Sequence, residues 1–306
     1  MKQYALLAAV LFGGTLMAET FLPGPFEGKK LPANWKSNIP ESAAVTDGSL
    51  QITSTNQETG LRSAEFPLKP DARYYAVMRM RSLSGPLAIR AGFVGNRWKW
   101  VGLESCELSG DWQWYAVERK SPTALESAPT VWAQFAVPAE KKIDVSNYGF
   151  FTFSMDPAQF PDTLRGVPGS YPEGWFPYTY QKIASGESGL SDDFQADGKK
   201  LTMRLNARDA DEIMHSAILT MPKSGKVNFT VKMRSADGTA NVKLFLIGDN
   251  YKWCPSREVT VTDSWQTFVL SAQLPMNPKN DEFRCRVDVR KGGEIVIADL
   301  KIELAP

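Results

Sequence analysis

The sequence predicts an all-β protein made of two tandem β-sandwich domains, and three observations support this prediction. Residues 62–100 align with residues 215–253 without a gap, and nine of the 39 pairs are identical. Hydrophobic and polar residues alternate along both copies, as they do in strands with one buried face. Turn residues recur about every 8–12 residues and no segment keeps a helical period, which is typical of an antiparallel sandwich.

The repeat sets the expected domain boundaries. The two copies lie too far apart in the chain for a solenoid repeat, so each is a whole domain. We expect module 1 over residues 19–155, a short Pro/Gly linker over residues 156–170, and module 2 over residues 171–306. Each module is long enough to close its own core, so we expect each to fold when expressed alone.

Residues 1–18 have the pattern of a secretory signal peptide. Lys2 supplies a positive charge, residues 4–16 form a short hydrophobic run, and Ala18 provides a small residue at a cleavage point. The run is shorter than a membrane-spanning helix. A buried N-terminal helix is the alternative interpretation. We expect a secreted or periplasmic protein without a membrane span.

Within each copy the alternation predicts which residues face the core. In module 1 these are Tyr74, Ala76, Met78 and Met80, then Ile89, Ala91 and Phe93, then Val131, Ala133, Phe135 and Val137. In module 2 they are Val227, Phe229, Val231 and Met233, then Val242, Leu244 and Leu246, then Phe283, Cys285, Val287 and Val289. Each set predicts three strands, and residues 295–304 form a closing strand after a Gly-Gly turn.

The cysteines align with small hydrophobic residues of the other copy. The pairs are Cys106 with Val259, Cys254 with Val101, and Cys285 with Ala133. We therefore predict free thiols that pack in the cores as small hydrophobic groups. Exported proteins often carry disulfides, and a Cys254–Cys285 bridge is the alternative.

Several short motifs of each copy are shared with one known family. They are residues 25–28 (Pro-Phe-Glu-Gly), 32–35 (Pro-Ala-Asn-Trp), 172–175 (Pro-Glu-Gly-Trp), the Trp turns at 111–115 and 263–268, and the closing strand at 293–302. On these motifs each copy resembles a jelly-roll module of the galactose-binding-like superfamily, in particular carbohydrate-binding modules of the family 4/9 type. The resemblance covers nearly all of the chain after residue 18 and implies a jelly-roll sandwich that binds carbohydrate.

The resemblance also bears on metal binding. Modules of this type often hold a structural calcium ion between an acidic residue near the opening and another in the closing strand. Module 1 keeps Glu27 but has Asn147 in the closing strand, and module 2 keeps Asp299 without the acidic opening. Each copy thus retains half of a site, so we expect no cofactor and no metal, with a structural calcium ion as the alternative.

The candidate carbohydrate site lies at a turn that recurs in both copies. Sugar recognition uses flat aromatic faces together with a few polar side chains. The turn carries these residues as Arg97, Trp98, Lys99 and Trp100 in module 1 and as Tyr251, Lys252 and Trp253 in module 2. Strand parity predicts that the rings point outward and that Val101 and Cys254 continue the inward face. The alternative is that one or both rings cap the end of the core.

Trp132 is a further candidate, because parity places it on the outward face of its strand. An isolated outward Trp is either a ligand platform or an interdomain contact. The outward faces are also basic, with Arg79, Arg81 and Arg90 in module 1 and Lys232, Arg234, Lys243, Arg284, Arg286 and Arg290 in module 2. A solvated strand face explains these residues, and pairing with uronate or sulfate groups is the functional alternative.

Composition narrows the class of function. The net charge is +1, which favours neither nucleic acid nor membrane as a partner. A single histidine excludes most catalytic triads and most zinc sites. We therefore expect a secreted, non-catalytic protein that binds a glycan or polysaccharide through both modules. The alternatives are a structural or adhesion protein whose exposed aromatics contact other extracellular proteins, and a polysaccharide-degrading enzyme that uses paired carboxylates.

Overall fold

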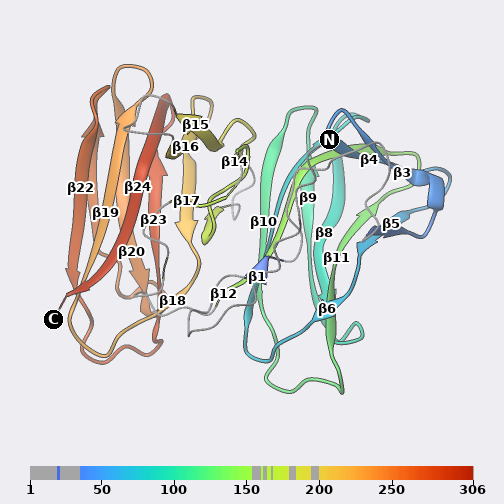
Figure 1. Cartoon of the computed structure of the whole chain (residues 1–306), viewed down its shortest axis with the longest axis horizontal. Coiled ribbons are helices and arrows are strands. Elements are labelled where there is room, and N and C mark those ends of the chain that lie inside the picture. Colours follow the sequence, from blue (N-terminus) through green and yellow to red (C-terminus); the bar gives the residue numbers. More distant parts are fainter. Residues whose placement is uncertain are drawn as a thin grey trace, which may run out of the picture.

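The computed structural model describes residues 19–20, 35–153, 160, 164–166, 168–178, 184–193 and 200–305. In this part of the chain four antiparallel sheets form two β-sandwiches that lie side by side (Figure 1). The expected signal peptide and Glu27 lie outside the described residues. Among those that are described, no helix is long and apolar enough to cross a membrane.

Module 1 consists of two sheets, called 1A and 1B here. Sheet 1A has the order β10-β7-β12-β4-β3 and comprises β3 (Ala43–Thr46), β4 (Ser49–Thr53), β7 (Arg73–Ser82), β10 (Gln113–Lys120) and β12 (Lys142–Phe153). Sheet 1B has the order β2-β5-β11-β8-β9 and comprises β2 (Trp35–Ser37), β5 (Thr59–Ser63), β6 (Phe66–Pro67, on β11), β8 (Leu87–Gly95), β9 (Trp100–Leu108) and β11 (Thr130–Val137). The short β1 (Glu19–Thr20) pairs with β12, and the 3-10 helix η1 (Pro40–Ser42) follows β2.

Module 2 repeats this arrangement strand by strand in sheets 2A and 2B. Sheet 2A has the order β22-β19-β24-β16-β15 and comprises β15 (Gly189–Asp193), β16 (Lys200–Ala207), β19 (Lys226–Ser235), β22 (Gln266–Gln273) and β24 (Gly293–Ala305). Sheet 2B has the order β13-β17-β23-β20-β21 and comprises β13 (Trp175–Pro177), β17 (Glu212–Ser216), β18 (Leu219–Thr220, on β23), β20 (Ala240–Gly248), β21 (Ser256–Val261) and β23 (Glu282–Val289). The 3-10 helix η3 (Asp249–Tyr251) follows β20.

Details of register confirm that the two modules are copies. The pairing of β12 with β7 skips Ser146, and the pairing of β24 with β19 skips Ala298, so both closing strands bulge at the same place. Ser63 Oγ accepts a hydrogen bond from the Ala133 N–H at 3.0 Å. In module 2, Ser216 Oγ accepts the equivalent bond from Cys285 at 2.9 Å. The predicted tandem jelly-roll sandwiches are therefore confirmed.

The predicted inward residues form the two cores. In module 1 all of the predicted residues in β7, β8 and β11 are buried, and so are those in β19, β20 and β23 of module 2. Burial of these alternating side chains is what holds each pair of sheets together. In the expected linker, Phe160 and Leu164 are buried with the core of module 2, and the Phe160 ring meets Trp175 edge-on at 5.6 Å.

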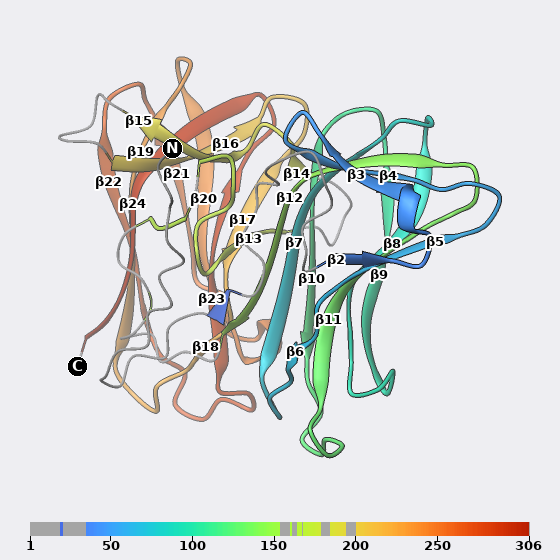
Figure 2. The same cartoon turned by 45° about the vertical axis from the view of Figure 1, so that its right-hand side comes forward.

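The modules stack so that the outer face of sheet 1A packs on the outer face of sheet 2B (Figures 1 and 2). Tyr75, Val77 and Trp114, on the outer face of 1A, belong to the hydrophobic cluster of module 2. The Trp114 indole N–H donates a hydrogen bond to the Ser188 carbonyl at 2.8 Å. The short β14 (Ala184–Ser185) pairs with the edge of β10. A strand from the module 2 side thus extends the sheet of module 1.

Charged groups also cross the boundary between the modules. Arg73 of module 1 contacts Glu118 at 3.1 Å and Glu282 of module 2 at 2.5 Å. Arg284 of module 2 reaches back to Glu118 at 3.4 Å. These two glutamates and two arginines therefore form a chain of alternating negative and positive charges at the interface, and the net charge of these four side chains is zero.

The cysteines are all free thiols. Cys106 and Cys285 are buried in the cores, as predicted, and no Cys254–Cys285 bridge is present. The prediction for Cys254 is wrong, because this side chain is exposed. Its position follows from the turn described below, which changes the parity of the strand after it.

Candidate functional site

The repeated turn has an unusual backbone in both modules. Asn96, Arg97 and Trp98 have φ angles of 50°, 52° and 68°, and the equivalent residues of η3 have φ angles of 47°, 53° and 67°. Three successive non-glycine residues therefore lie in the left-handed region. This region costs L-residues roughly 1–2 kcal/mol each, and bulky residues seldom adopt it. Both copies keep this backbone although their turn sequences differ.

A buried polar side chain holds each turn in place. In module 1, Asn96 Oδ1 accepts a hydrogen bond from the Glu126 N–H at 3.0 Å. In module 2, Asp249 Oδ1 accepts bonds from the N–H groups of Lys279 and Asn280 at 2.7 and 3.0 Å. Asn and Asp tolerate the left-handed region best among non-glycine residues, which explains why they begin the two turns.

The turn presents one aromatic ring to solvent in each module. The Trp98 side chain is 58% exposed and Tyr251 is 64% exposed. These are two of the few large hydrophobic side chains on the surface of the described chain. Strained backbone of this kind clusters at active sites and ligand-binding segments of proteins.

The prediction that the rings of Trp100 and Trp253 point outward is wrong. Trp100 is buried between Tyr74 and Phe93, and its ring centroid lies 5.3 Å from that of Tyr74 and 4.9 Å from that of Phe93. Its indole N–H donates to the Lys120 carbonyl at 3.0 Å. The left-handed turn shifts the parity of the strand that follows, so Val101 is the exposed neighbour.

Trp253 also packs against the core of its module, although it is only half-buried. Its ring lies edge-on to Phe283 at 6.1 Å, and its indole N–H donates to the Gln273 carbonyl at 3.0 Å. The parity shift leaves Cys254 exposed, as it does Val101 in module 1. In each module the ring at the tip of the turn is thus available to a ligand, whereas the ring two residues later belongs to the core.

Trp132 lies on the outer face of sheet 1B, as predicted, but it is buried. The Trp98 ring meets it edge-on at 5.7 Å, and the Arg62 guanidinium lies 5.8 Å from its centroid. Its indole N–H donates to Gln134 Oε1 at 3.1 Å. Sheet 1B is on the side of module 1 away from module 2 (Figure 1), so the interdomain alternative is wrong. Trp132 supports the exposed Trp98 and is not an open platform itself.

The polar residues of the turn differ in their availability. Arg97 and Lys252 are exposed. Lys99 is also exposed, but its ammonium group forms an ion pair with Glu126. Of the basic residues predicted at the two turns, Arg97 in module 1 and Lys252 in module 2 are therefore exposed to solvent next to the exposed rings and form no ion pair within the described part of the chain.

The outer face of sheet 2B carries a different set of residues at the equivalent positions. His215 and Arg284 replace Arg62 and Trp132, and in sequence alignment Arg286 stands where module 1 has Gln134. The Tyr178 ring lies edge-on to His215 at 5.7 Å, and the Arg286 guanidinium lies 4.9 Å from the Tyr178 centroid. Unlike its counterpart in module 1, this face is turned toward the neighbouring module.

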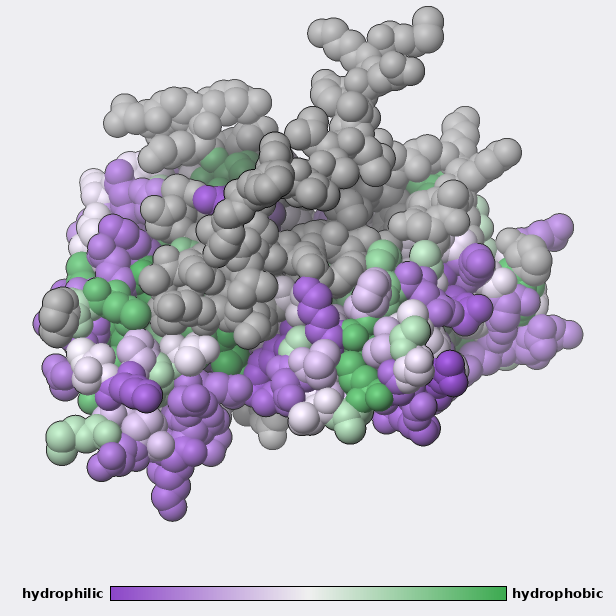
Figure 3. All heavy atoms as spheres, turned by 60° about the horizontal axis from the view of Figure 1, so that its bottom comes forward, coloured by the Kyte–Doolittle hydropathy of each residue, from purple (hydrophilic) through white to green (hydrophobic). Residues whose placement is uncertain are grey.

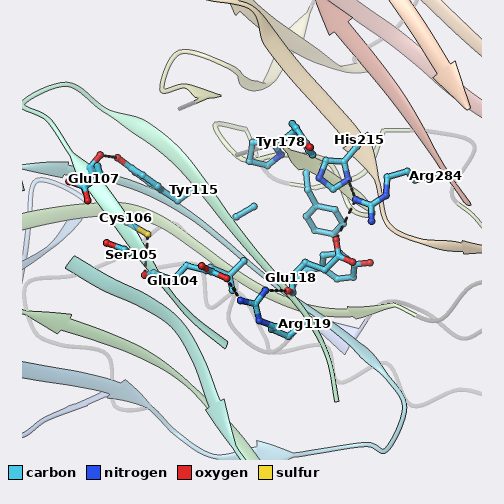
Figure 4. Close-up of a pocket in the computed structure, with 15 residues that line it drawn as sticks. Glu104, Ser105, Cys106, Glu107, Tyr115, Glu118, Arg119, Tyr178, His215 and Arg284 are labelled. Carbon is cyan, nitrogen blue, oxygen red and sulfur yellow. Dashed lines mark hydrogen bonds and ion pairs between the residues drawn. The ribbon is translucent and has the colours of Figure 1, made fainter. Parts of the chain in front are cut away.

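A cleft of about 590 Å³ lies between the modules at this face (Figure 4). Glu104, Glu107, Tyr115, Glu118 and Arg119 line it from β9 and β10 of module 1, and Phe176, Tyr178, His215 and Arg284 line it from module 2. Acidic and basic side chains face each other across it. Its volume lies within the range of roughly 300–1,000 Å³ that is typical of small-ligand pockets.

His215, the only histidine of the chain, is held neutral in this cleft. Burial and the neighbouring Arg284 guanidinium lower its pKa to about 3. Its Nδ1 lies 2.8 Å from the Ser216 carbonyl and 3.3 Å from Arg284 Nη1, and because the shorter contact is to an acceptor we place the ring proton on Nδ1. Nε2 is then the atom that can accept a hydrogen bond. A neutral, buried imidazole of this kind does not take up a proton at physiological pH.

Most of the basic side chains that the sequence places on the outer faces are already paired. The ion pairs are Arg81–Asp144, Arg90–Glu58, Lys243–Glu258, Arg284–Glu118, Arg286–Asp288 and Arg290–Asp211. Paired arginines attract an anionic ligand less than free ones do. This pairing disfavours the acidic-polysaccharide alternative.

Among the described residues, His, Cys, Asp and Glu side chains form no group of three that could hold a metal ion. Asn147 stands at the closing-strand position of the calcium half-site in module 1, and its Nδ2 donates a hydrogen bond to the Gly169 carbonyl at 3.0 Å. Its amide therefore acts as a donor within the fold.

The interface between the modules was not predicted from the sequence. Its signal lies in the differences between the copies, where Tyr75, Val77 and Trp114 stand on the outer face of 1A at positions that module 2 fills with Asn228, Thr230 and Thr267. Large hydrophobic residues at outward positions in one copy alone indicate a surface that only this copy buries. The glutamates and arginines of the cleft carry no comparable signal.

Neither a family model nor a curated protein matches this sequence. Among solved structures, the fold is similar to the tandem CBM22-1–CBM22-2 domain of Xyn10C from Paenibacillus barcinonensis, with a TM-score of 0.35 and 10% identity over 94% of this chain and 97% of that chain. It is also similar to TmCBM61 in complex with β-1,4-galactotriose, with a TM-score of 0.34 and 13% identity over 47% of this chain and 99% of that chain. A CBM4 structure has a TM-score of 0.29 and 14% identity over 42% of this chain and 86% of that chain.

Proposed function

We propose that this protein is exported, to the periplasm or outside the cell, and binds a polysaccharide without cleaving it. Trp98 is the principal contact in module 1, and Tyr251 is the corresponding contact in module 2. The observation that carries the proposal is the turn of three left-handed residues, which keeps an exposed ring at the same place in both copies. An exposed aromatic face on a rigid support suits the apolar C–H face of a sugar ring.

The surroundings of Trp98 favour binding to a neutral glycan. The Trp132 ring meets the Trp98 ring edge-on and is itself packed against the Arg62 guanidinium, so Trp98 rests on an ordered support, which limits the entropy lost when a sugar stacks on it. Arg97 lies exposed beside the ring and supplies hydrogen-bond donors for hydroxyl groups. The ion pairs described above involve most of the basic side chains predicted on the outer faces, which makes those side chains less available to uronate or sulfate groups.

The structural alternative requires a surface that other proteins can cover. Figure 3 shows one face of the molecule on which hydrophilic side chains predominate and the hydrophobic ones form separate patches. Protein interfaces of stable assemblies need a larger continuous area. On this face the arrangement favours binding of a glycan over assembly with protein partners.

The test is retention on insoluble polysaccharides. We expect the protein to be retained by at least one of microcrystalline cellulose, xylan, mannan and chitin, and to release no reducing sugar during prolonged incubation. Trp98→Ala should weaken retention about tenfold or more, since a stacked aromatic ring contributes on the order of 1–3 kcal/mol. Tyr251→Ala should have a smaller effect.

Leu83→Ala serves as the matched control, because Leu83 is a large hydrophobic side chain that is 41% exposed and precedes β8, whereas Trp98 follows the other end of that strand. Retention that is equal for Trp98→Ala and Leu83→Ala would contradict the proposal. Release of reducing sugar would favour the enzyme, and large assemblies in solution would favour the structural protein.

A further inference from the structure

We propose that the cleft between the modules is a second glycan site, which both modules build together and which takes a short neutral oligosaccharide. The site is separate from Trp98, which lies on the opposite side of module 1, and it can exist whether or not Trp98 binds polysaccharide. Its walls are β9 and β10 on one side and β13, β17 and β23 on the other. The tandem arrangement therefore creates a cavity that neither module has alone.

The polar side chains of the cleft are held in place in pairs. Arg119 forms an ion pair with Glu104, and Arg284 lies 3.4 Å from Glu118. A carboxylate has about four acceptor positions and a guanidinium has five N–H donors, so each pair keeps unused hydrogen-bonding capacity. Neighbouring hydroxyl groups of a sugar match such paired donors and acceptors.

The balance of charge points to a neutral ligand. The carboxylates of Glu104, Glu107 and Glu118 would repel an anionic ligand. Arg119 and Arg284 would repel a cationic ligand. His215 adds no charge because it is neutral. A ligand with many hydroxyl groups and no net charge avoids both repulsions.

An aromatic side chain completes the site on the side of module 2. Tyr178 is half-buried at the wall of the cleft, and its hydroxyl is hydrogen-bonded to Tyr251, the exposed ring of the repeated turn. Arg284 also lines a smaller hollow of about 220 Å³ that includes Tyr251. The cleft thus continues toward the exposed ring, and the end of a glycan that contacts Tyr251 can enter it.

The single histidine provides a specific reporter for the cleft. NMR of the imidazole group of the full chain gives one His signal, and this signal comes from His215. We would titrate with cellotriose, xylotriose and β-1,4-galactotriose. We expect a saturable shift of the His215 signal with at least one of them, and we expect the shift to persist in Trp98→Ala.

Variants of the cleft carboxylates test the assignment of its residues. Glu104→Gln should raise the dissociation constant at least fivefold without changing the melting temperature, because the Glu104 side chain is 43% exposed. Glu303→Gln, an exposed glutamate on β24, is the control and should leave the titration unchanged.

The absence of a saturable shift with all three trisaccharides would overturn the cleft site. If Trp98-dependent retention on polysaccharide persisted in the same protein, the proposed function would stand while this inference failed. Loss of the shift in Trp98→Ala, or equal effects of Glu104→Gln and Glu303→Gln, would also overturn it.

Discussion

The rings of Tyr75 and Phe176 stack face to face across the boundary of the two modules, with centroids 4.3 Å apart and an angle of 7° between their planes. The Tyr75 hydroxyl also accepts a hydrogen bond from the Ile218 N–H at 3.1 Å. Trp114 packs edge-on against Tyr171 at 5.1 Å nearby. Side chains of module 1 thus complete the packing of module 2, and this packing fixes the geometry of the cleft.

The interface changes what we expect of the separated modules. Residues 19–155 alone would expose Tyr75, Val77 and Trp114, and residues 171–306 alone would expose Phe176. Each large side chain contributes about 1.5–3 kcal/mol when fully buried. Both halves should therefore unfold at lower temperatures than the full chain, and calorimetry of the three proteins would show it. Halves that melt as high as the intact protein would mean that the interface contributes nothing.

The two rings of the repeated turn should respond differently to truncation. Trp100→Ala removes a buried ring between Tyr74 and Phe93 and should lower the free energy of unfolding by about 3–5 kcal/mol. Trp98→Ala removes an exposed ring and should cost about 1 kcal/mol or less. Urea unfolding of both variants measures this difference. Equal losses would place Trp98 in the core and remove it from the binding site.

Two neighbouring groups on β17 should give the stability an unusual dependence on pH. Burial raises the pKa of Glu212 to about 7. Hydrogen bonds from Ser185, Ser188 and Tyr171 stabilise the carboxylate and partly oppose this rise. Folded Glu212 therefore holds a proton that unfolded Glu212 loses above its ordinary pKa of 4.5. Its contribution to stability is present below pH 4.5 and is lost as the pH rises to about 7.

His215 acts in the opposite direction. Its ordinary pKa is 6.5, and burial lowers the pKa in the folded protein to about 3. Between these values the unfolded chain holds a proton that the folded chain lacks, so stability falls as the pH drops from 6.5 to about 3. Between pH 4.5 and 6.5 the two contributions offset each other.

Removing either group should reveal the other. In His215→Gln, the free energy of unfolding should rise more than in the native protein as the pH falls from 7 to 4.5. In Glu212→Gln, it should fall more than in the native protein as the pH falls from 6.5 to 3. The limit is about 1.4 kcal/mol per pH unit for one group. Denaturant unfolding at a series of pH values tests this, and parallel profiles for all three proteins would refute it.

The thiols should differ in reactivity because they differ in exposure. Cys254 is exposed, whereas burial raises the pKa of Cys106 to about 12 and also raises the pKa of Cys285. A thiol reagent should therefore modify Cys254 in the native protein, and Cys106 and Cys285 should react after denaturation. Mass spectrometry of the labelled peptides checks the assignment. A Cys254–Cys285 disulfide in the native protein would contradict it.

The class of fold, the duplication and most of the core residues could be predicted from the amino-acid sequence. Period-two alternation is a local property, because successive side chains of a strand point to opposite faces. The inward faces of β7, β8 and β11 and of their counterparts could therefore be predicted residue by residue. The repeated turn could also be located, since an aromatic residue, a lysine and a tryptophan recur in the same order in both copies.

The sequence pattern could not predict which rings face solvent or where the modules meet, because both depend on tertiary packing. Parity failed at Trp100, Trp253 and Cys254 because three left-handed residues reverse the faces of the strand after the turn, and no local pattern signals such a backbone. The cleft joins Glu104 and Arg119 to His215 and Arg284, which are about a hundred or more positions away in the sequence. Alternation specifies a buried face within each sheet, whereas the packing of sheet 1A on sheet 2B depends on the shapes of both surfaces together.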